Sequence, residues 1–227
     1  MNAAIKMFCY QCEQTKGGTG CTTQGVCGKD PITATLQDLL LYATEGIAQF
    51  AHRARQLGAT DREINLFTVE ALFSTITNVN FDPERLKGLI FRAAELKEQA
   101  HKLYLDACRS KGVQPETLYG PATWEPAPDL EGLVTQGKEV GIISRHERFG
   151  DEKADLMDLI LFGLKGAAAY TDHAAILGKE DEQIYARFHQ LLDYLTRDQF
   201  DTDELLTNAL AVGELNLRGT ALLDAAN

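Results

Sequence analysis

Apolar residues recur at three- and four-residue spacing through most of this chain, and this pattern constrains the fold most because it is the period of an amphipathic α-helix. The first such stretch begins near Thr35 and stops at Leu57 and Gly58, where glycine favours a helix end. Asp82 followed by Pro83 is typical of a helix start, with a capping residue before proline at the first helical position. The spacing predicts an all-α protein with helices over residues 35–57, 61–79, 83–111, 151–177, 181–197 and 202–226.

The second half of the chain repeats the first. Shifted by 120 residues, positions 36–64 match positions 156–184 without a gap, with 11 identities in 29 positions. A shift by 119 residues continues the match through the third helix of each copy. Helical composition accounts for the shared leucines, but not for a Leu-Gly stop and an Asp restart in the same register. We therefore expect two three-helix bundles related by internal duplication, over residues 31–112 and 151–227, each with an up-down-up arrangement.

Residues 113–150 interrupt the helical pattern. Four of the six prolines fall there, together with Trp124, the only tryptophan. This composition predicts a connector with at most short helices, which Trp124 anchors to a bundle. Within the second repeat, Gly163 and Gly166 leave room for another backbone, so we expect a tight contact between helices there.

Charge and hydropathy narrow the possible partners. Lys and Arg total 22 against 33 Asp and Glu, and the net charge of −11 disfavours binding to nucleic acid or to an anionic membrane. The longest uncharged apolar run, residues 159–164, is too short to span a bilayer. No apolar stretch of signal-peptide length precedes Phe8. We therefore expect a cytoplasmic protein.

Four of the five cysteines are crowded into an N-terminal segment, residues 1–30, with the spacing C-x2-C-x8-C-x5-C. Glycines between and beside these cysteines allow the chain to turn sharply and expose backbone N–H groups. A cytoplasmic location disfavours disulfides. Two alternatives remain open from the spacing: a structural zinc site, and an iron–sulfur cluster, which requires the same soft thiolates. The candidate ligands are Cys9, Cys12, Cys21 and Cys27.

The cysteine segment and several later runs resemble the start of the hybrid-cluster proteins, also called prismane proteins or hydroxylamine reductases. The runs are MFCYQCEQT at 7–15, GCT at 20–22, GVCGK at 25–29, LQDLL at 36–40, FSTITNVNFD at 73–82, GLKGAAAY at 163–170, HAAILG at 173–178 and LLDAAN at 222–227. The resemblance implies a helical N-terminal domain of two three-helix bundles. It also implies that Cys9, Cys12, Cys21 and Cys27 hold a conventional cluster, and the short spacing is similar to that of relatives with a 4Fe–4S cluster.

In that family the reaction takes place at a second, hybrid iron–sulfur–oxygen cluster, whose ligands lie in later α/β domains and have no counterpart in these 227 residues. The resemblance therefore implies an electron-entry domain without catalytic residues of its own. Its expected partners are an electron-donor redox protein and the missing catalytic domains, which reduce hydroxylamine or nitric oxide. Two other hypotheses are a stand-alone 4Fe–4S module that senses redox state or nitric oxide, and a zinc-stabilised interaction module.

The remaining candidate residues are expected to be structural. Cys108, on a helical face, is expected to be a packed thiol. His173 lies in a family-like run, but no second ligand is found one helical turn away.

Overall fold

Aspartate side chains cap the start of several helices. In this computed structural model, which describes residues 6–14 and 16–227, each of these carboxylates accepts a hydrogen bond from a backbone N–H of the first helical turn. The capping residues are Asp30, Asp61, Asp82, Asp129, Asp181 and Asp201. The starts of these six helices are therefore determined by local sequence.

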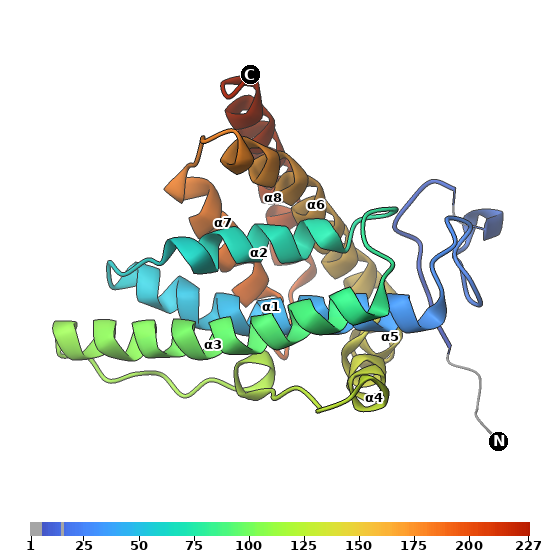
Figure 1. The fold of residues 1–227 in the computed structure, drawn as a ribbon, viewed down its shortest axis with the longest axis horizontal. Helices are drawn as coiled ribbons and strands as arrows, with labels where there is room; N and C mark the ends of the chain where they lie inside the picture. The colour runs from blue at the N-terminus through green and yellow to red at the C-terminus, as the bar shows by residue number, and fades with distance from the viewer. Residues whose placement is uncertain (1–5, 15) are drawn as a thin grey trace.

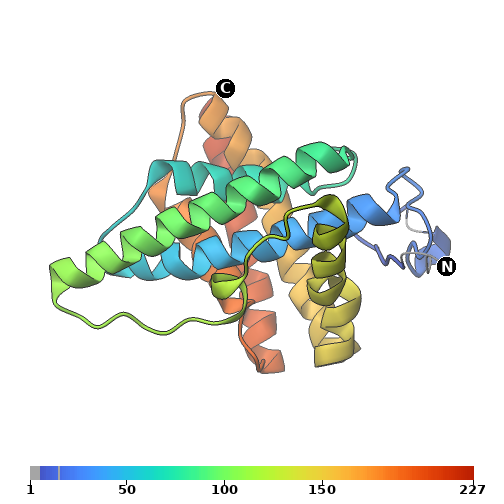
Figure 2. The same ribbon diagram turned by 60° about the horizontal axis from the view of Figure 1, so that its bottom comes forward.

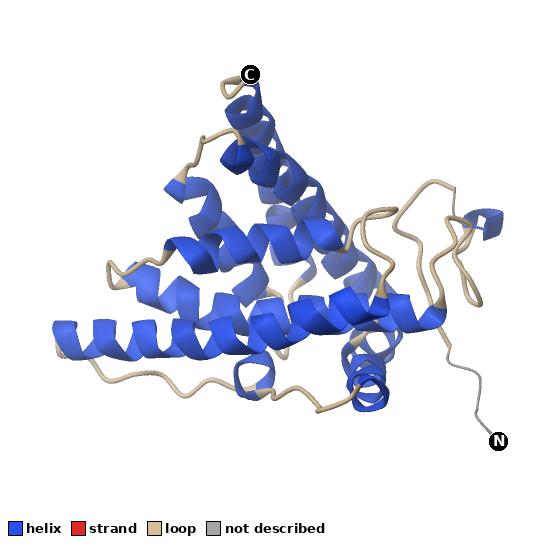
Figure 3. Ribbon diagram, viewed as in Figure 1, coloured by secondary structure: helices blue, strands red, loops and turns tan. Residues whose placement is uncertain are grey.

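The described residues form α-helices and no strand, so the all-α prediction is confirmed (Figures 1 and 3). The helices are α1 (Pro31–Gln56), α2 (Arg62–Ser74), α3 (Pro83–Lys111), α4 (Leu130–Val140), α5 (Ile142–Phe149), α6 (Asp151–Ile176), α7 (Glu182–Tyr194) and α8 (Thr202–Asp224), with short 3-10 helices η1 (Lys16–Gly18) and η2 (Gly120–Thr123). In this part of the chain no helix has both the length and the apolar character needed to cross a membrane.

Two helix boundaries differ by four or more residues from the predicted ones. The first helix begins at Pro31 rather than near residue 35, because Asp30 caps it and proline suits the first helical position. The second helix ends at Ser74 rather than near residue 79. There the Thr75 hydroxyl donates to the carbonyl oxygen three residues earlier at 2.8 Å, and Asn78 has a φ of 63°, which does not continue a right-handed helix.

The helices pack as two crossing pairs, with α1 along α3 and α6 along α8 (Figure 1). Helix α2 packs more extensively on α6 than on α1 or α3, and α7 packs more extensively on α1 than on α6 or α8. Val69 and Leu72 of α2 accordingly share a core with Leu161 and Leu164 of α6. Helices α2 and α7 therefore interlock the two three-helix units. The internal duplication and the domain boundaries drawn from it stay predictions.

The predicted small-residue contact is confirmed between α6 and α8. A Cβ added at Gly163 would lie 2.3 Å from Val212 Cγ1, and the Asn216 side-chain amide donates to the Gly163 carbonyl oxygen at 3.0 Å. At Gly166 the nearest atom to an added Cβ is Asn216 Oδ1, at 3.3 Å. The missing side chain at Gly163 is therefore what lets the two helices approach.

The connector crosses α1 and carries η2, α4 and α5 (Figure 2). Its helices are short, as predicted, at 11 and 8 residues for α4 and α5. Trp124 is partly buried against the core that α1 and α3 share, and its carbonyl oxygen accepts a hydrogen bond from the buried Lys97 ammonium. Trp124 thus anchors the connector.

Candidate metal centre

The N-terminal segment lies at one end of the molecule, beside the start of α1 (Figure 1). Within this segment, Cys9 and Cys21 lie opposite each other. The Cys9 N–H donates to the Cys21 carbonyl oxygen at 3.1 Å, and the Cys21 N–H donates to the Cys9 carbonyl oxygen at 2.8 Å. Residues that exchange both bonds in an antiparallel bridge have Cα atoms about 5.5 Å apart and side chains on the same side. The structure therefore brings together the first and third of the four predicted ligands.

Two glycines permit the course of this segment. Gly20 has a φ of 133°, and a Cβ there would lie 2.4 Å from the Phe8 ring. A Cβ at Gly25 would lie 3.0 Å from Cys27 Sγ, where the Gly25 N–H donates to the Lys29 carbonyl oxygen at 2.8 Å and closes a turn around the cysteine. A side chain at Gly20 would displace the Phe8 ring, and one at Gly25 would crowd the Cys27 thiol.

Cys12 and Cys27 lie in the same segment as half-buried thiols. Across residues 6–14 and 16–227, no three His, Cys, Asp or Glu side chains are gathered to hold one metal ion. The structure thus pairs Cys9 with Cys21 without gathering all four ligands. The donor set nevertheless fits an iron–sulfur cluster or zinc in kind, because four thiolates are ligands of both.

The two residues between Cys9 and Cys12 are held by α6. The Tyr10 hydroxyl lies 2.9 Å from Asp155 Oδ1 and 2.8 Å from Asp158 Oδ2, and its single proton is shared between these two carboxylates. The Lys165 ammonium donates to Gln11 Oε1 at 2.8 Å. All three contacts join residues about 150 positions apart in the chain, so tertiary packing alone creates them.

Buried charges surround these contacts. Asp158 is fully buried and forms an ion pair with Arg145 of α5. Lys165 is 4% exposed, and burial together with the like charge of Lys29 lowers the pKa of its ammonium to about 7. Burial, followed by the charge of Asp158, raises the pKa of the Tyr10 phenol well above its ordinary value. The cysteine segment therefore rests on a polar region from which water is largely excluded.

Asp158 and Lys165 were not identified from the sequence, although it contained a signal for each. Asp158 is identical to Asp38 in the 120-residue register, and both interrupt a largely apolar helical run. Asp38 also lies in this polar region: its Oδ2 accepts the Ile142 N–H at 3.1 Å, and burial raises the pKa of the carboxyl. Lys165 is the one charged residue between positions 159 and 171. A lone charge in an apolar helical stretch is a candidate for burial.

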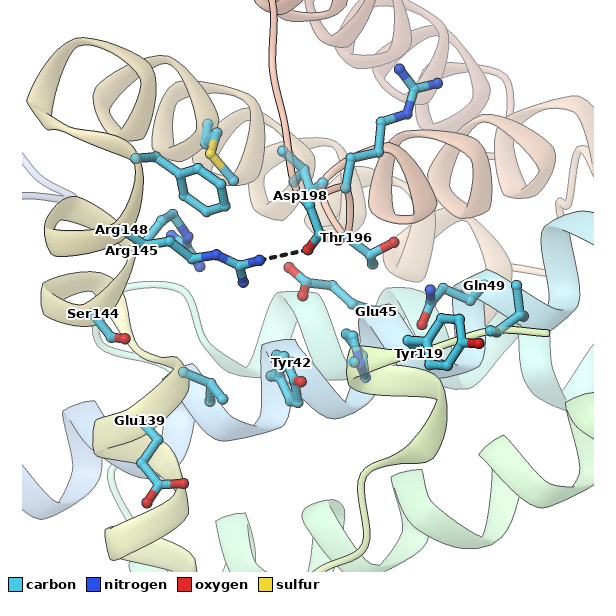
Figure 4. Close-up of a pocket in the computed structure, with 18 of the residues that line it drawn as sticks. Tyr42, Glu45, Gln49, Tyr119, Glu139, Ser144, Arg145, Arg148, Thr196 and Asp198 are labelled. Carbon is cyan, nitrogen blue, oxygen red and sulfur yellow. Dashed lines mark hydrogen bonds and ion pairs between the residues drawn. The ribbon is translucent and has the colours of Figure 1, made fainter.

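A second site is a pocket of about 440 Å³ between α1, η2, α5 and the segment that follows α7 (Figure 4). Glu45 of α1 points into it, is 6% exposed, and forms no hydrogen bond or ion pair with another described residue. Burial raises the pKa of Glu45 to about 7, although the charge of Arg145 opposes the rise. Arg148 and Asp198 form an ion pair of 2.5 Å within the lining. The pocket thus presents a carboxyl that exchanges its proton near neutral pH.

Two other candidates from the sequence are structural, as expected. Cys108 is 2% exposed within the core shared by α1 and α3. The His173 Nδ1 lies 2.7 Å from the carbonyl oxygen of Ala169, and its ring packs edge-on against Phe73 with centroids 5.3 Å apart.

A sequence model of the Prismane/CO dehydrogenase family matches residues 7–227, from the cysteine segment to the end of α8. The chain belongs to this family. The expected resemblance is therefore confirmed, and it extends across the whole of the described fold.

Individual relatives in the Prismane/CO dehydrogenase family carry the name hydroxylamine reductase. The protein from Acidithiobacillus ferrooxidans is 46% identical over 225 residues, that from Rhodospirillum rubrum is 46% identical over 221 residues, and that from Syntrophobacter fumaroxidans is 48% identical over 221 residues. Each alignment covers 97% of this chain and 40% of the relative. The chain therefore spans about two fifths of the length of the curated relatives it matches.

Proposed function

We propose that this chain is the electron-transfer domain of a hydroxylamine reductase-like oxidoreductase, and that Cys9, Cys12, Cys21 and Cys27 bind one 4Fe–4S cluster. The observation that carries the proposal is the set of four thiol donors within 19 residues, in a chain 46% identical to a hydroxylamine reductase over 97% of its length. The reciprocal hydrogen bonds between Cys9 and Cys21 support it, because they fix two of the four ligands side by side.

When bound, such a cluster accepts and donates one electron at a time. The chain would supply the four thiolates that hold the cluster, in a glycine-rich segment. Helix α6 supplies polar contacts to Tyr10 and Gln11 from the buried side chains of Asp158 and Lys165.

In this proposal the reduction of hydroxylamine or nitric oxide takes place at a hybrid cluster in further domains of the family proteins, to which this chain relays electrons. Multi-electron reduction requires open coordination positions, which full cysteine ligation does not leave. The electron donor is a redox protein that makes a small, transient contact. A net charge of −11 disfavours nucleic acid and membranes as partners, and thiol ligands favour the reducing cytoplasm.

The ligation is tested by preparing the protein anaerobically with iron and sulfide. We expect about four iron and four sulfide per chain, with brown absorption that dithionite bleaches. Stoichiometric zinc without sulfide, under iron-replete anaerobic conditions, would contradict the cluster and favour the zinc-stabilised module.

The relay is tested by a steady-state assay with reduced viologen and hydroxylamine, beside a full-length hydroxylamine reductase. We expect the 227-residue chain to be redox-active but to show no turnover comparable to that of the relative. Comparable turnover would place the catalytic centre in this chain and overturn the proposal.

A further inference from the structure

The metal-binding segment and α6 meet through buried charged groups that ordinary packing does not require. Asp158 is fully buried and Lys165 is 4% exposed, seven residues apart on the same helix. Burying an ionised side chain is costly unless it is paired or hydrogen-bonded. Each of these side chains is bonded to one of the two residues between Cys9 and Cys12.

The hydrogen-bond partner of Lys165 is a neutral amide, whereas a buried structural lysine usually pairs with a carboxylate. Within the part of the chain that the structure describes, it forms no ion pair with a carboxylate, and its ammonium donates instead to the neutral amide of Gln11 at 2.8 Å. The Gln11 amide in turn lies 3.5 Å from the carbonyl oxygen of Thr75, at the end of α2. Gln11 thus links the cysteine segment to both α6 and α2.

Asp158 binds Tyr10, the other residue between Cys9 and Cys12. Arg145 neutralises its charge, which leaves the second carboxylate oxygen to accept the Tyr10 hydroxyl at 2.8 Å. The Tyr10 ring packs edge-on against Phe162, between the two charged positions on α6, with centroids 5.5 Å apart. Both residues of the Cys-Tyr-Gln-Cys motif are therefore fixed to one rigid helix. Side chains held on a helix position ligands more closely than a free loop does.

We propose that Asp158 and Lys165 are positioning residues for the metal ligands: through Tyr10 and Gln11 they fix Cys9 and Cys12 on α6, and the ammonium of Lys165 raises the reduction potential of a cluster bound there. This rests on the proposed function. The effect on the potential follows because reduction adds negative charge beside a buried cation, and the interaction is strong where water is excluded. The anionic thiolates in turn favour the charged form of the lysine.

The positioning role is tested first on the chain without metal, by hydrogen exchange of the backbone amides in residues 9–12. Gln11→Leu removes the acceptor and leaves the α6 charge in place, Lys165→Met removes the donor, and Lys165→Arg keeps a charged donor. Lys179→Met, at an exposed lysine beyond the end of α6, is the matched control. We expect faster exchange in Gln11→Leu and Lys165→Met, and wild-type exchange in Lys165→Arg and the control. Unchanged exchange in both Gln11→Leu and Lys165→Met would overturn the positioning role.

The same variants are then loaded anaerobically with iron and sulfide and titrated for their midpoint potential. Lys165→Met should lower the potential, Lys165→Arg should restore it, and Gln11→Leu should reduce the amount of cluster retained. A potential equal to the wild type in Lys165→Met would overturn the electrostatic part of the proposal. Because exchange is measured without metal, a failure of the positioning contacts is distinguishable from a wild-type chain that takes up no cluster.

Discussion

Replacing the buried Glu45 by glutamine should stabilise the protein at neutral and alkaline pH. The Glu45 carboxyl projects into the pocket between α1 and the connector, where no described residue forms a hydrogen bond or ion pair with it. Glutamine has nearly the same shape and does not ionise. Glu45→Gln therefore removes the cost of burying a negative charge while leaving the packing of α1 unchanged.

The magnitude follows from the pKa. Burial raises the pKa of Glu45 from 4.5 to about 7, and each pH unit corresponds to about 1.4 kcal/mol. Below pH 4.5 the carboxyl is protonated in the folded and unfolded states alike, so it costs no stability through ionisation. As the pH rises from 4.5 to about 7, only the unfolded state loses the proton, and the free energy of unfolding falls by roughly 3 kcal/mol. Glu45→Gln should escape this loss.

The assay is urea unfolding of wild type and Glu45→Gln at several pH values between 4 and 8, with thiols kept reduced. The difference in unfolding free energy should be smallest near pH 4 and should grow to about 3 kcal/mol in favour of the variant by pH 8, with similar urea dependence of stability. Glu139→Gln, at an exposed position on the rim of the same pocket, should change stability by less than about 0.5 kcal/mol at every pH. A difference for Glu45→Gln that stays constant with pH would refute the reasoning.

Three further predictions concern the cysteines, the helix contact and a buried histidine. Cys12→Ser should abolish cluster binding, whereas Cys108→Ser, at a thiol 2% exposed in the core, should retain wild-type iron and sulfide; equal loss in both would contradict the ligand assignment. Gly163→Ala places a methyl group 2.3 Å from Val212 Cγ1 and should lower the free energy of unfolding by about 1–3 kcal/mol. An unchanged midpoint in urea unfolding would contradict the tight contact of α6 with α8. Burial lowers the pKa of His189 from 6.5 to about 3, so as the pH falls from 6.5 to 5 only the unfolded state gains a proton, and roughly 2 kcal/mol of unfolding free energy should be lost. His189→Leu should not show this loss, and parallel stability profiles of wild type and variant against pH would contradict the prediction.

The all-α class and most helix positions could be predicted because the signals are local. An Asp cap satisfies N–H groups two or three residues away, and an apolar stripe is defined within a few turns. A helix boundary was predicted wrongly where a second local interaction competed with the apolar pattern. At the end of α2 the Thr75 hydroxyl bonds a helix carbonyl oxygen, and Asn78 adopts a left-handed conformation, so the helix ends before its hydrophobic spacing does.

The prediction of the ligand set also came from the sequence alone, because four thiols at this spacing and the family-like runs around them need no coordinates to be recognised. Only the tertiary structure decided which groups surround those thiols. Lys165 meets Gln11 across 154 positions, and Tyr10 meets Asp158 across 148, because the N-terminal segment packs against α6. Periodicity predicts that a helix has a buried face, but not which helix covers it. That choice depends on the summed packing of many side chains distant in sequence.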